Sequence, residues 1–379
     1  MNSVNPWTMM LILSASLPSL AAAEYELPAG VERVLELPPG EGNPRNSEGD
    51  FISLQGGGVM FVYTHFVGGG GDHSAAHLAA RRSPDGGKSW SAEDTLVLSN
   101  EGGMNVMSVS LLRLKSGPIA LFYLRKNAED DCRPFLRLSA DEGQTWSEAQ
   151  ACIPEPIGYY VVNNDRVVQL NSGRLVIPAA RHAFKGEKFS GRGTVVFYLS
   201  DDEGKTWRSA KTSISPPEDL KSGLQEPGVI ELKDGRLMML ARTTGGCQYR
   251  SYSTDGGDTW TPAEATDLLS PCSPATFERI PSTGDILLVW NNHRDISPDL
   301  VGQRTPLSAA ISHDEGQTWE KIRNIETDPQ GWYCYTAVEF IGEHVLLGLC
   351  AGDRRQNGLA RTEVLRIPVT WFYEEPTRK

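Results

Sequence analysis

The apolar positions of the chain occur in short alternating runs that are separated by turn residues. Four of these runs follow a turn and read "GGGVMFVYTH", "SGPIALFYLR", "SGRLVIPAAR" and "DGRLMMLART". Alternation over roughly 4–8 residues, bounded by Gly, Asp or Ser, is typical of β-hairpins. No helical stretch interrupts the pattern. The sequence therefore predicts an all-β protein.

A phrase of the form S-x-D-x-G-x-[S/T]-W recurs along the chain. Its five copies begin at Ser83, Ser139, Ser200, Ser253 and Ser312. Its Asp can accept backbone N–H groups, its Gly can turn the chain, and its Trp can anchor the hairpin. A sixth unit, "TAVEFIGEHVLLGLC", lacks the phrase. Repeats of this length without helices predict a six-bladed β-propeller with four-stranded antiparallel blades.

Composition narrows the class of protein. The 379 residues carry a formal charge of −12 and no run of Lys or Arg, which argues against a nucleic-acid partner. Six cysteines fit an oxidising compartment. Their spacing suits local bridges between Cys132 and Cys152, Cys247 and Cys272, and Cys334 and Cys350, although fifteen pairings are open. No C-x-x-C suggests a zinc site.

The N-terminus has the features of a secretory signal. Residues 7–20 are mostly apolar, and "AAAE" offers a cleavage site after Ala23, although no Lys or Arg precedes the apolar run. An uncleaved anchor is the alternative, but the run is shorter than the ~20 residues of a membrane span. We predict a signal over residues 1–23, a single domain over residues 24–379 with no membrane span, and a secreted or periplasmic protein.

The repeated phrase resembles the Asp box of the sialidase superfamily, whose fold is a six-bladed propeller. The resemblance extends from about Arg45 to Cys350. It implies a retaining exo-α-sialidase that uses a tyrosine nucleophile, needs no metal or cofactor, and acts on a sialylated glycan or a related acidic sugar. The oligomeric state stays open.

The segment "LQEPGVIELKDGRLMMLART" carries the most specific part of the resemblance. It places Glu226 at the start of one strand and Arg242 at the end of the next. The resemblance implies that Glu226 polarises the catalytic tyrosine and that Arg242 binds the sugar carboxylate. Arginine suits this task because its guanidinium is always charged and can bind a carboxylate through two hydrogen bonds.

Two further segments supply another arginine and the tyrosine. The loop before the last Asp box contains Arg304, with Arg294 as a competitor, and "GWYCYTAVEF" contains Tyr335, with Tyr333 one alternation away. We favour Arg304 as a carboxylate ligand and Tyr335 as the nucleophile. The acidic residue that the family has after this strand is replaced by "LCAGD".

The N-terminal part of the candidate site departs from the family. Arg45, in "NPRNSEGDFISL", occupies the place of the first family arginine, and Glu48 and Asp50 are alternative pocket carboxylates. The Gly-rich loop after the next strand carries Asp72, which we predict to be the acid/base residue. His65 and His73 are alternative acids or substrate contacts.

The H-x-x-x-H spacing of His73 and His77 would suit a metal only on a helix, and the Gly-rich flank argues against one. Asp165 and Arg181 repeat the spacing of Glu226 and Arg242, and Arg125 is placed similarly in its repeat. These three residues contact other arms of the sugar or form structural ion pairs. Two alternative functions are open beside the sialidase: an enzyme for another acidic sugar, such as another nonulosonic acid or a uronate, and a non-catalytic sugar-binding propeller.

Overall fold

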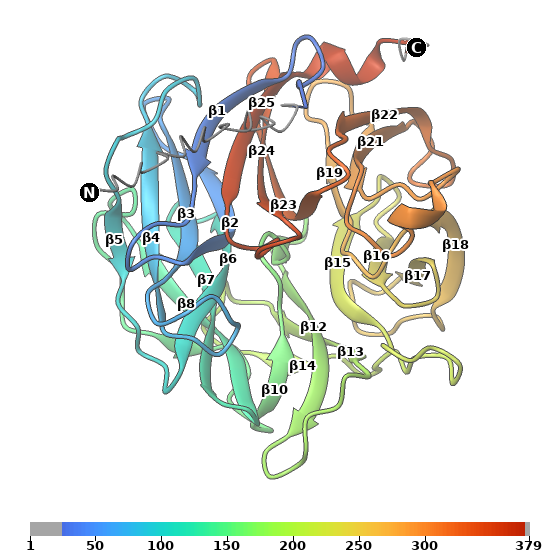
Figure 1. Cartoon of the computed structure of the whole chain (residues 1–379). Helices are drawn as coiled ribbons and strands as arrows, with labels where there is room; N and C mark the ends of the chain where they lie inside the picture. The colour runs from blue at the N-terminus through green and yellow to red at the C-terminus, as the bar shows by residue number, and fades with distance from the viewer. Residues whose placement is uncertain (1–24, 376–379) are drawn as a thin grey trace, which may run out of the picture.

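The fold consists of antiparallel β-sheets that stand around a central region (Figure 1). This computed structural model describes residues 25–375, so the predicted signal over residues 1–23 lies outside the described residues. The described helices are two 3₁₀ turns, η1 (Pro298–Leu300) and η2 (Val369–Tyr373). Within the described range, no helix is long and apolar enough to cross a membrane. The prediction of an all-β protein is confirmed.

Four sheets have four strands each. The first contains β2 (Arg45–Ser53), β3 (Val59–Phe66), β4 (Ala76–Ser83) and β5 (Thr95–Leu98). The second contains β15 (Gln225–Glu231), β16 (Leu237–Arg242), β17 (Cys247–Ser253) and β18 (Glu264–Leu269). The third contains β19 (Thr276–Arg279), β20 (Ile286–Trp290), β21 (Leu307–Ser312) and β22 (Glu320–Glu326). The fourth pairs β23 (Gly331–Ile341), β24 (His344–Asp353), β25 (Thr362–Pro368) and β1 (Glu32–Leu37). Four-stranded antiparallel sheets were the expected unit, and these four confirm it.

A fifth sheet has nine strands and consists of two antiparallel groups. One group contains β6 (Asn105–Arg113), β7 (Ile119–Ala128), β8 (Asp131–Ser139) and β9 (Gln150–Ala151). The other contains β10 (Gly158–Val161), β11 (Val168–Gln169), β12 (Leu175–Phe184), β13 (Thr194–Ser200) and β14 (Arg208–Ser209). A single parallel pair, Tyr159 with Cys132, connects the two groups. The strand pairing between the two groups is thus limited to this one pair, while an apolar cluster that includes Leu136 and Ile177 packs between them.

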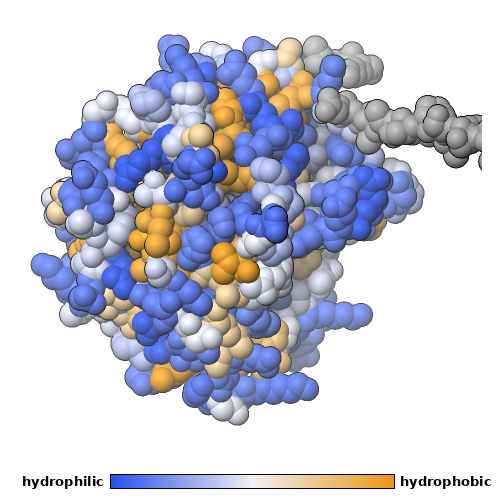
Figure 2. Space-filling view, turned by 60° about the vertical axis from the view of Figure 1, so that its left-hand side comes forward, coloured by the Kyte–Doolittle hydropathy of each residue, from blue (hydrophilic) through white to orange (hydrophobic). Residues whose placement is uncertain are grey.

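The apolar core lies between neighbouring groups of strands. One cluster contains Leu240 of β16 and Leu288 of β20, and thus joins two successive sheets. Another contains Phe61 of β3 and Leu346 of β24, so the first and the last sheets also share a core. The face shown in Figure 2 is mostly hydrophilic and carries small, separate apolar groups. The hydrophobic effect thus acts mainly between the sheets.

The five repeated phrases form the same hydrogen-bonded turn. In the first copy, Ser83 Oγ accepts the Gly87 N–H at 2.8 Å, and Asp85 accepts the N–H and the hydroxyl of Ser89 at 2.9 and 2.6 Å. These hydrogen bonds, led by those from Ser89, lower the pKa of Asp85 to about 2. Gly87 has φ 83°, and a Cβ there would lie 2.6 Å from Leu346. The phrase is therefore architectural: it holds a turn against the neighbouring sheet.

A buried group of acidic residues joins the N-terminal strand to the last two sheets. Arg33 of β1 donates to Glu363 at 2.6 Å and to Glu326 at 3.0 Å, and the Tyr333 hydroxyl lies 3.3 Å from Glu326. Burial, and then the charge of Glu363, raise the pKa of Glu326 to about 8. One arginine thus serves two carboxylates, and the folded protein favours a proton on Glu326.

This arrangement predicts a loss of stability at alkaline pH. The pKa of Glu326 is higher in the folded than in the unfolded chain. The stability that protonated Glu326 adds to the folded protein is therefore fully present below about pH 4.5 and is lost as the pH rises through about 8. We expect the free energy of unfolding to fall by roughly 2 kcal/mol between pH 6 and 9 through this group. Urea unfolding at both pH values should show a smaller fall in Glu326→Gln than in the wild type. Glu320→Gln, an exposed change on the same strand, should match the wild type, and equal falls in all three proteins would contradict the assignment.

Candidate active site

Four strands that line the centre carry a β-bulge at an equivalent place. The register with the second strand shifts between Ser47 and Asp50, Met107 and Ser110, Gln225 and Gly228, and Cys334 and Ala337. In each bulge one residue has a left-handed backbone, namely Glu48 (φ 54°), Ser108 (φ 58°), Glu226 (φ 46°) and Tyr335 (φ 58°). A bulge re-aims the side chain that it carries. All four side chains line one pocket.

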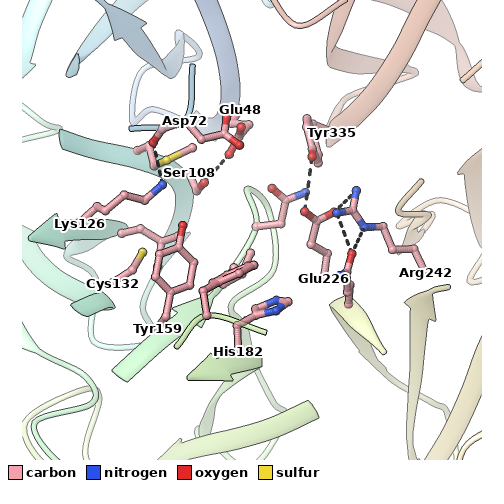
Figure 3. A pocket seen from close by; sticks show the side chains of 16 residues that line it. Glu48, Asp72, Ser108, Lys126, Cys132, Tyr159, His182, Glu226, Arg242 and Tyr335 are labelled. Carbon is pink, nitrogen blue, oxygen red and sulfur yellow. Dashed lines mark hydrogen bonds and ion pairs between the residues drawn. The ribbon is translucent and has the colours of Figure 1, made fainter. Parts of the chain in front are cut away.

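This pocket encloses about 180 Å³ and combines charged with aromatic walls. Figure 3 shows Asp72 and Lys126 on one side and Glu226 and Arg242 on the other, with Tyr159 and His182 below them. The remaining lining residues are Glu48, Met107, Ser108, Leu124, Cys132, Val161, Asn163, Phe189, Gln225 and Tyr335. The lining thus offers acids, cations, a phenol and an apolar surface for a small polar molecule.

One side of the pocket brings together residues from three sheets. The Tyr335 hydroxyl lies 3.4 Å from Glu226 Oε1, and Arg242 Nη1 lies 3.0 Å from Glu226 Oε2. The Arg304 guanidinium stands 5.1 Å from the centre of the Tyr335 ring. Burial, and then the charge of Glu226, raise the pKa of Tyr335 above its ordinary value. The phenol is therefore held neutral beside a carboxylate that can accept its proton.

Two arginines and one carboxylate leave this side with an excess of positive charge. Gln225 accepts from Arg242 at 3.0 and 3.2 Å. Arg242 Nη1 forms the ion pair with Glu226 but no hydrogen bond to any of the described residues. Arg304 Nη2 donates to the Cys272 carbonyl at 3.1 Å. An anionic ligand would therefore meet two guanidinium groups that have one carboxylate between them.

The opposite side is a network around Arg45, which is 1% exposed. Its guanidinium donates to Asp72 at 2.6 Å, to Glu48 at 2.8 Å and to Ser47 at 2.9 Å. Glu48 also accepts the hydroxyl of Ser108. Arg45 is not among the residues that line the pocket, whereas its partners Asp72 and Glu48 are. Its charge is already shared between two carboxylates.

The pKa values of the two carboxyl groups in this network are shifted in opposite directions. Burial opposes the charged form of Asp72, but Arg45 outweighs it and holds the pKa of Asp72 below its ordinary value. Burial raises the pKa of Glu48, and Arg45 offsets only part of that effect. Glu48 is thus the more readily protonated of the two groups, whereas half-exposed Asp72 favours its ionised form.

The backbone of the loop that carries Asp72 is tied down from β6 and β7. Asn105 Nδ2 donates to the carbonyls of Asp72 and Ser74 at 2.9 and 2.8 Å. Lys126 Nζ donates to the same Asp72 carbonyl at 2.7 Å. The Gly-rich loop is thus fixed at the position that brings Asp72 to the pocket.

Five of the nine predicted site residues are not among the lining residues. Arg45 and Arg304 each contact a residue that lines the pocket, whereas the other three have contacts elsewhere. Arg125 stacks at 3.7 Å on the Phe135 ring, and Arg181 stacks at 4.3 Å on the Phe184 ring. Asp165 accepts the Val338 N–H at 3.0 Å in the buried centre, where burial raises its pKa to about 6. The structure therefore gives these three side chains structural contacts.

Of the alternative residues, Glu48 lines the pocket, and the others do not. Arg294 donates to the Asp267 carbonyl on an exposed loop, and Tyr333 contacts Glu326. Asp50 accepts the Leu111 N–H at 2.7 Å beneath the pocket. His65 stacks on His77 at 4.5 Å and contacts Asp94.

The residues 25–375 contain no group of three or more His, Cys, Asp or Glu side chains that could hold a metal. All six cysteines are free thiols, although Cys334 and Cys350 face each other across β23 and β24.

Sequence reasoning missed Ser108, Lys126, Tyr159 and His182. The sequence does contain a signal for Ser108. This residue lies nine positions before the turn residue Gly117, and Glu226 lies nine positions before the turn residue Gly235 of its own repeat. The other three come from strands whose pocket-facing positions depend on how the sheets are arranged. No motif marks them.

The comparisons agree with this class of fold. The family described as BNR repeat-like domain matches residues 65–344, and the chain belongs to this family, within the sialidase superfamily. A sialidase of Micromonospora viridifaciens is 25% identical over 298 residues, which cover 69% of this chain and 43% of that protein. An anhydrosialidase of Macrobdella decora is 29% identical over 133 residues, 33% of this chain and 16% of that protein. The chain spans less than half the length of these curated relatives.

Solved structures share the fold. A protein of unknown function from Dyadobacter fermentans has a TM-score of 0.71 at 18% identity, covering 89% of this chain and 100% of that one. The NanB sialidase of Streptococcus pneumoniae has a TM-score of 0.69 at 15% identity, covering 91% and 72%. A leech intramolecular trans-sialidase complexed with 2,7-anhydro-Neu5Ac has a TM-score of 0.69 at 16% identity, covering 89% and 70%.

One buried amide holds two of the bulges together, which gives a test of the site's architecture. Asn164 Nδ2 donates to the carbonyls of Gly49 and Tyr335 at 2.8 and 2.9 Å. Asn164→Ala leaves both buried carbonyls without this donor, so we expect the free energy of unfolding to fall by roughly 1–3 kcal/mol in urea titrations. Asn171→Ala, at an exposed turn, should stay within about 0.5 kcal/mol of the wild type. An equally small effect of both substitutions would contradict this bracing role.

Proposed function

We propose that residues 24–379 form one six-bladed β-propeller. In this proposal the nine-stranded sheet contributes two blades, the other four sheets contribute one each, and β1 completes the last blade by pairing with β25. The apolar cluster shared by the first and the last sheets supports such a closed arrangement. The pocket then lies at the axis, where the innermost strands of several blades meet. We further propose that the protein is exported.

We propose that the protein is a retaining exo-α-sialidase that releases a terminal sialic acid from glycoconjugates. The observation that carries this proposal is the contact between Tyr335 and Glu226, 3.4 Å apart, with the Arg242 and Arg304 guanidinium groups beside them. A phenol beside a carboxylate base is the arrangement that a tyrosine nucleophile requires. A neutral nucleophile also avoids repulsion by the carboxylate of the sugar.

The reaction would begin with the sugar carboxylate at Arg242 and Arg304. Tyr335 Oη attacks the anomeric carbon while its proton passes to Glu226, and the glycosidic oxygen leaves. Water then attacks the anomeric carbon and breaks its bond to Tyr335 Oη. The sugar is released, and Tyr335 regains its proton from Glu226. Asp72 protonates the leaving oxygen in the first step and takes a proton from water in the second.

The ion pair between Arg45 and Asp72 bears on the first step. Asp72 has to carry a proton when the glycosidic bond breaks, yet Arg45 favours its ionised form. A substrate that approaches Arg45 would weaken this pair and raise the pKa of Asp72. The proton would thus be acquired only with the substrate in place.

A second candidate is an enzyme for another acidic sugar. It is favoured by the two carboxylates that occupy Arg45, because this arginine has few free donors for a sugar carboxylate. A sugar held by Arg242 and Arg304 alone could differ from sialic acid in shape. The assay below therefore includes glycosides of more than one acidic sugar.

The role of Tyr335 is tested by two matched substitutions on one strand. Tyr335→Phe removes the nucleophilic oxygen, and we expect kcat/KM on an aryl sialoside to fall by roughly 10³-fold or more. Tyr333→Phe, which removes a hydroxyl outside this pocket, should change it by less than about threefold. Release of the sugar is followed by the absorbance of the aryl group and by NMR of the first anomer. A correctly folded wild type that cleaves no aryl sialoside would exclude the leading proposal, and cleavage of another acidic glycoside would favour the second candidate.

The role of Asp72 is tested by varying the leaving group. Asp72→Asn removes the acid, and we expect kcat/KM on sialyl-lactose to fall by roughly 10²–10⁴-fold. The fall should be much smaller on a sialoside with an acidic phenol, because such a leaving group departs without a proton. Glu48→Gln is the matched control. Its kcat/KM on sialyl-lactose and its kcat/KM on the sialoside with the acidic phenol should fall by the same factor. The opposite pattern would assign the acid to Glu48, which has the higher pKa.

A further inference from the structure

Lys126 is a buried cation in the pocket for which the proposed reaction has no use. It extends from β7, is 2% exposed and lines the pocket. Its ammonium group has three N–H donors. Among residues 25–375, the backbone carbonyl of Asp72 is the single hydrogen-bond acceptor that Lys126 Nζ reaches. Two donors of a desolvated charge therefore lack protein acceptors.

The surroundings of Lys126 define what such donors could bind. The Tyr159 ring centre lies 5.5 Å from Nζ, and Phe189 packs against Tyr159 at 5.1 Å and against His182 at 5.0 Å. No carboxylate of the described residues forms a salt bridge with Lys126. The ammonium therefore faces a small space with an apolar, aromatic floor. Leaving such a charge unsatisfied is costly, so an acceptor from the ligand would be strongly favoured.

Lys126 lies across the pocket from the side that holds Arg242. Figure 3 shows Lys126 and Asp72 across the pocket from Glu226 and Arg242. A sugar acid held at the arginines would present its far substituents to Lys126. Asp72 and Glu48 line the same side, so a second anionic group there would be repelled. A neutral acceptor oxygen, carbonyl or hydroxyl, fits the charges better.

We propose that Lys126 is a specificity-determining residue that binds a neutral acceptor oxygen on the sugar, opposite the carboxylate. This inference rests on the proposed function, because it assumes a sugar acid at Arg242 and Arg304. One free N–H donor of Lys126 hydrogen-bonds to that oxygen, while another stays on the Asp72 carbonyl. Sugars without the oxygen leave the buried ammonium unsatisfied and bind less tightly.

The test pairs deletions on the ligand with a deletion on the protein. Calorimetry measures binding of the 2,3-didehydro form of N-acetylneuraminic acid and of three analogues, which lack the 4-hydroxyl, the 5-acylamino group or the glycerol side chain. Each is titrated into the full chain, into Lys126→Met and into Lys115→Met. Lys115 is a matched control, because it donates to the Asn171 carbonyl at 2.6 Å on the surface. Lys126→Arg is a second variant that keeps the charge. Asn105 still holds the Asp72 carbonyl in both Lys126 variants.

One of the three deletions should weaken binding to the wild type and to Lys115→Met by about tenfold or more, and binding to Lys126→Met by less than about twofold. Lys126→Arg should retain part of the discrimination. Deletions that weaken binding equally in the wild type and in Lys126→Met would overturn the inference while leaving the sugar-acid site intact. A folded wild type that binds none of the four compounds would overturn the proposed function, and the inference with it.

Discussion

The left-handed bulge in the innermost strands is the constraint on which the site depends. Side chains of a regular strand alternate between the two faces, so the residues nearest the centre would pack between the sheets. One residue with positive φ per bulge turns Glu48, Ser108, Glu226 and Tyr335 toward the pocket instead. Such a backbone costs on the order of 1–3 kcal/mol per residue. The surrounding sheets have to offset that cost, and they do so through hydrogen bonds such as those of Asn164.

The contact between Tyr335 and Glu226 therefore depends on packing far from the pocket. The two residues belong to different sheets, and no covalent or short-range link sets their distance. The third sheet lies between theirs in the sequence, and apolar clusters join it to the second and the fourth sheets. The Asp-box turns fix the outer ends of the same sheets, as Gly87 does against Leu346. The recurrent phrase thus supports the pocket without contributing to its chemistry.

The sequence was sufficient for the hairpins, the turns and one half of the pocket. The motifs indicated both the strand and the position within it for one group of residues, so their proximity could be predicted. This group contains Glu226, Arg242, Arg304 and Tyr335. The sixteen-residue spacing of Asp165 and Arg181 marked only the strands. Asp165 shares the left-handed backbone, yet its carboxylate turns to the Val338 N–H and stays beneath the pocket. Lys126 escaped notice because a lone lysine in an apolar strand becomes informative only when its burial and its partners are known.

The charges of the pocket explain why its two sides would have different tasks. Arg45 is paired with both Glu48 and Asp72, whereas Glu226 is the one carboxylate of the described residues that stands beside Arg242 and Arg304. An anion therefore gains most at the side that holds Tyr335, and it arrives next to the phenol. A carboxylate in place of Tyr335 would repel such an anion and would compete with Glu226 for the same arginines. Under the proposed function, the excess of positive charge selects the neutral nucleophile, and the balanced side is free to distinguish neutral substituents.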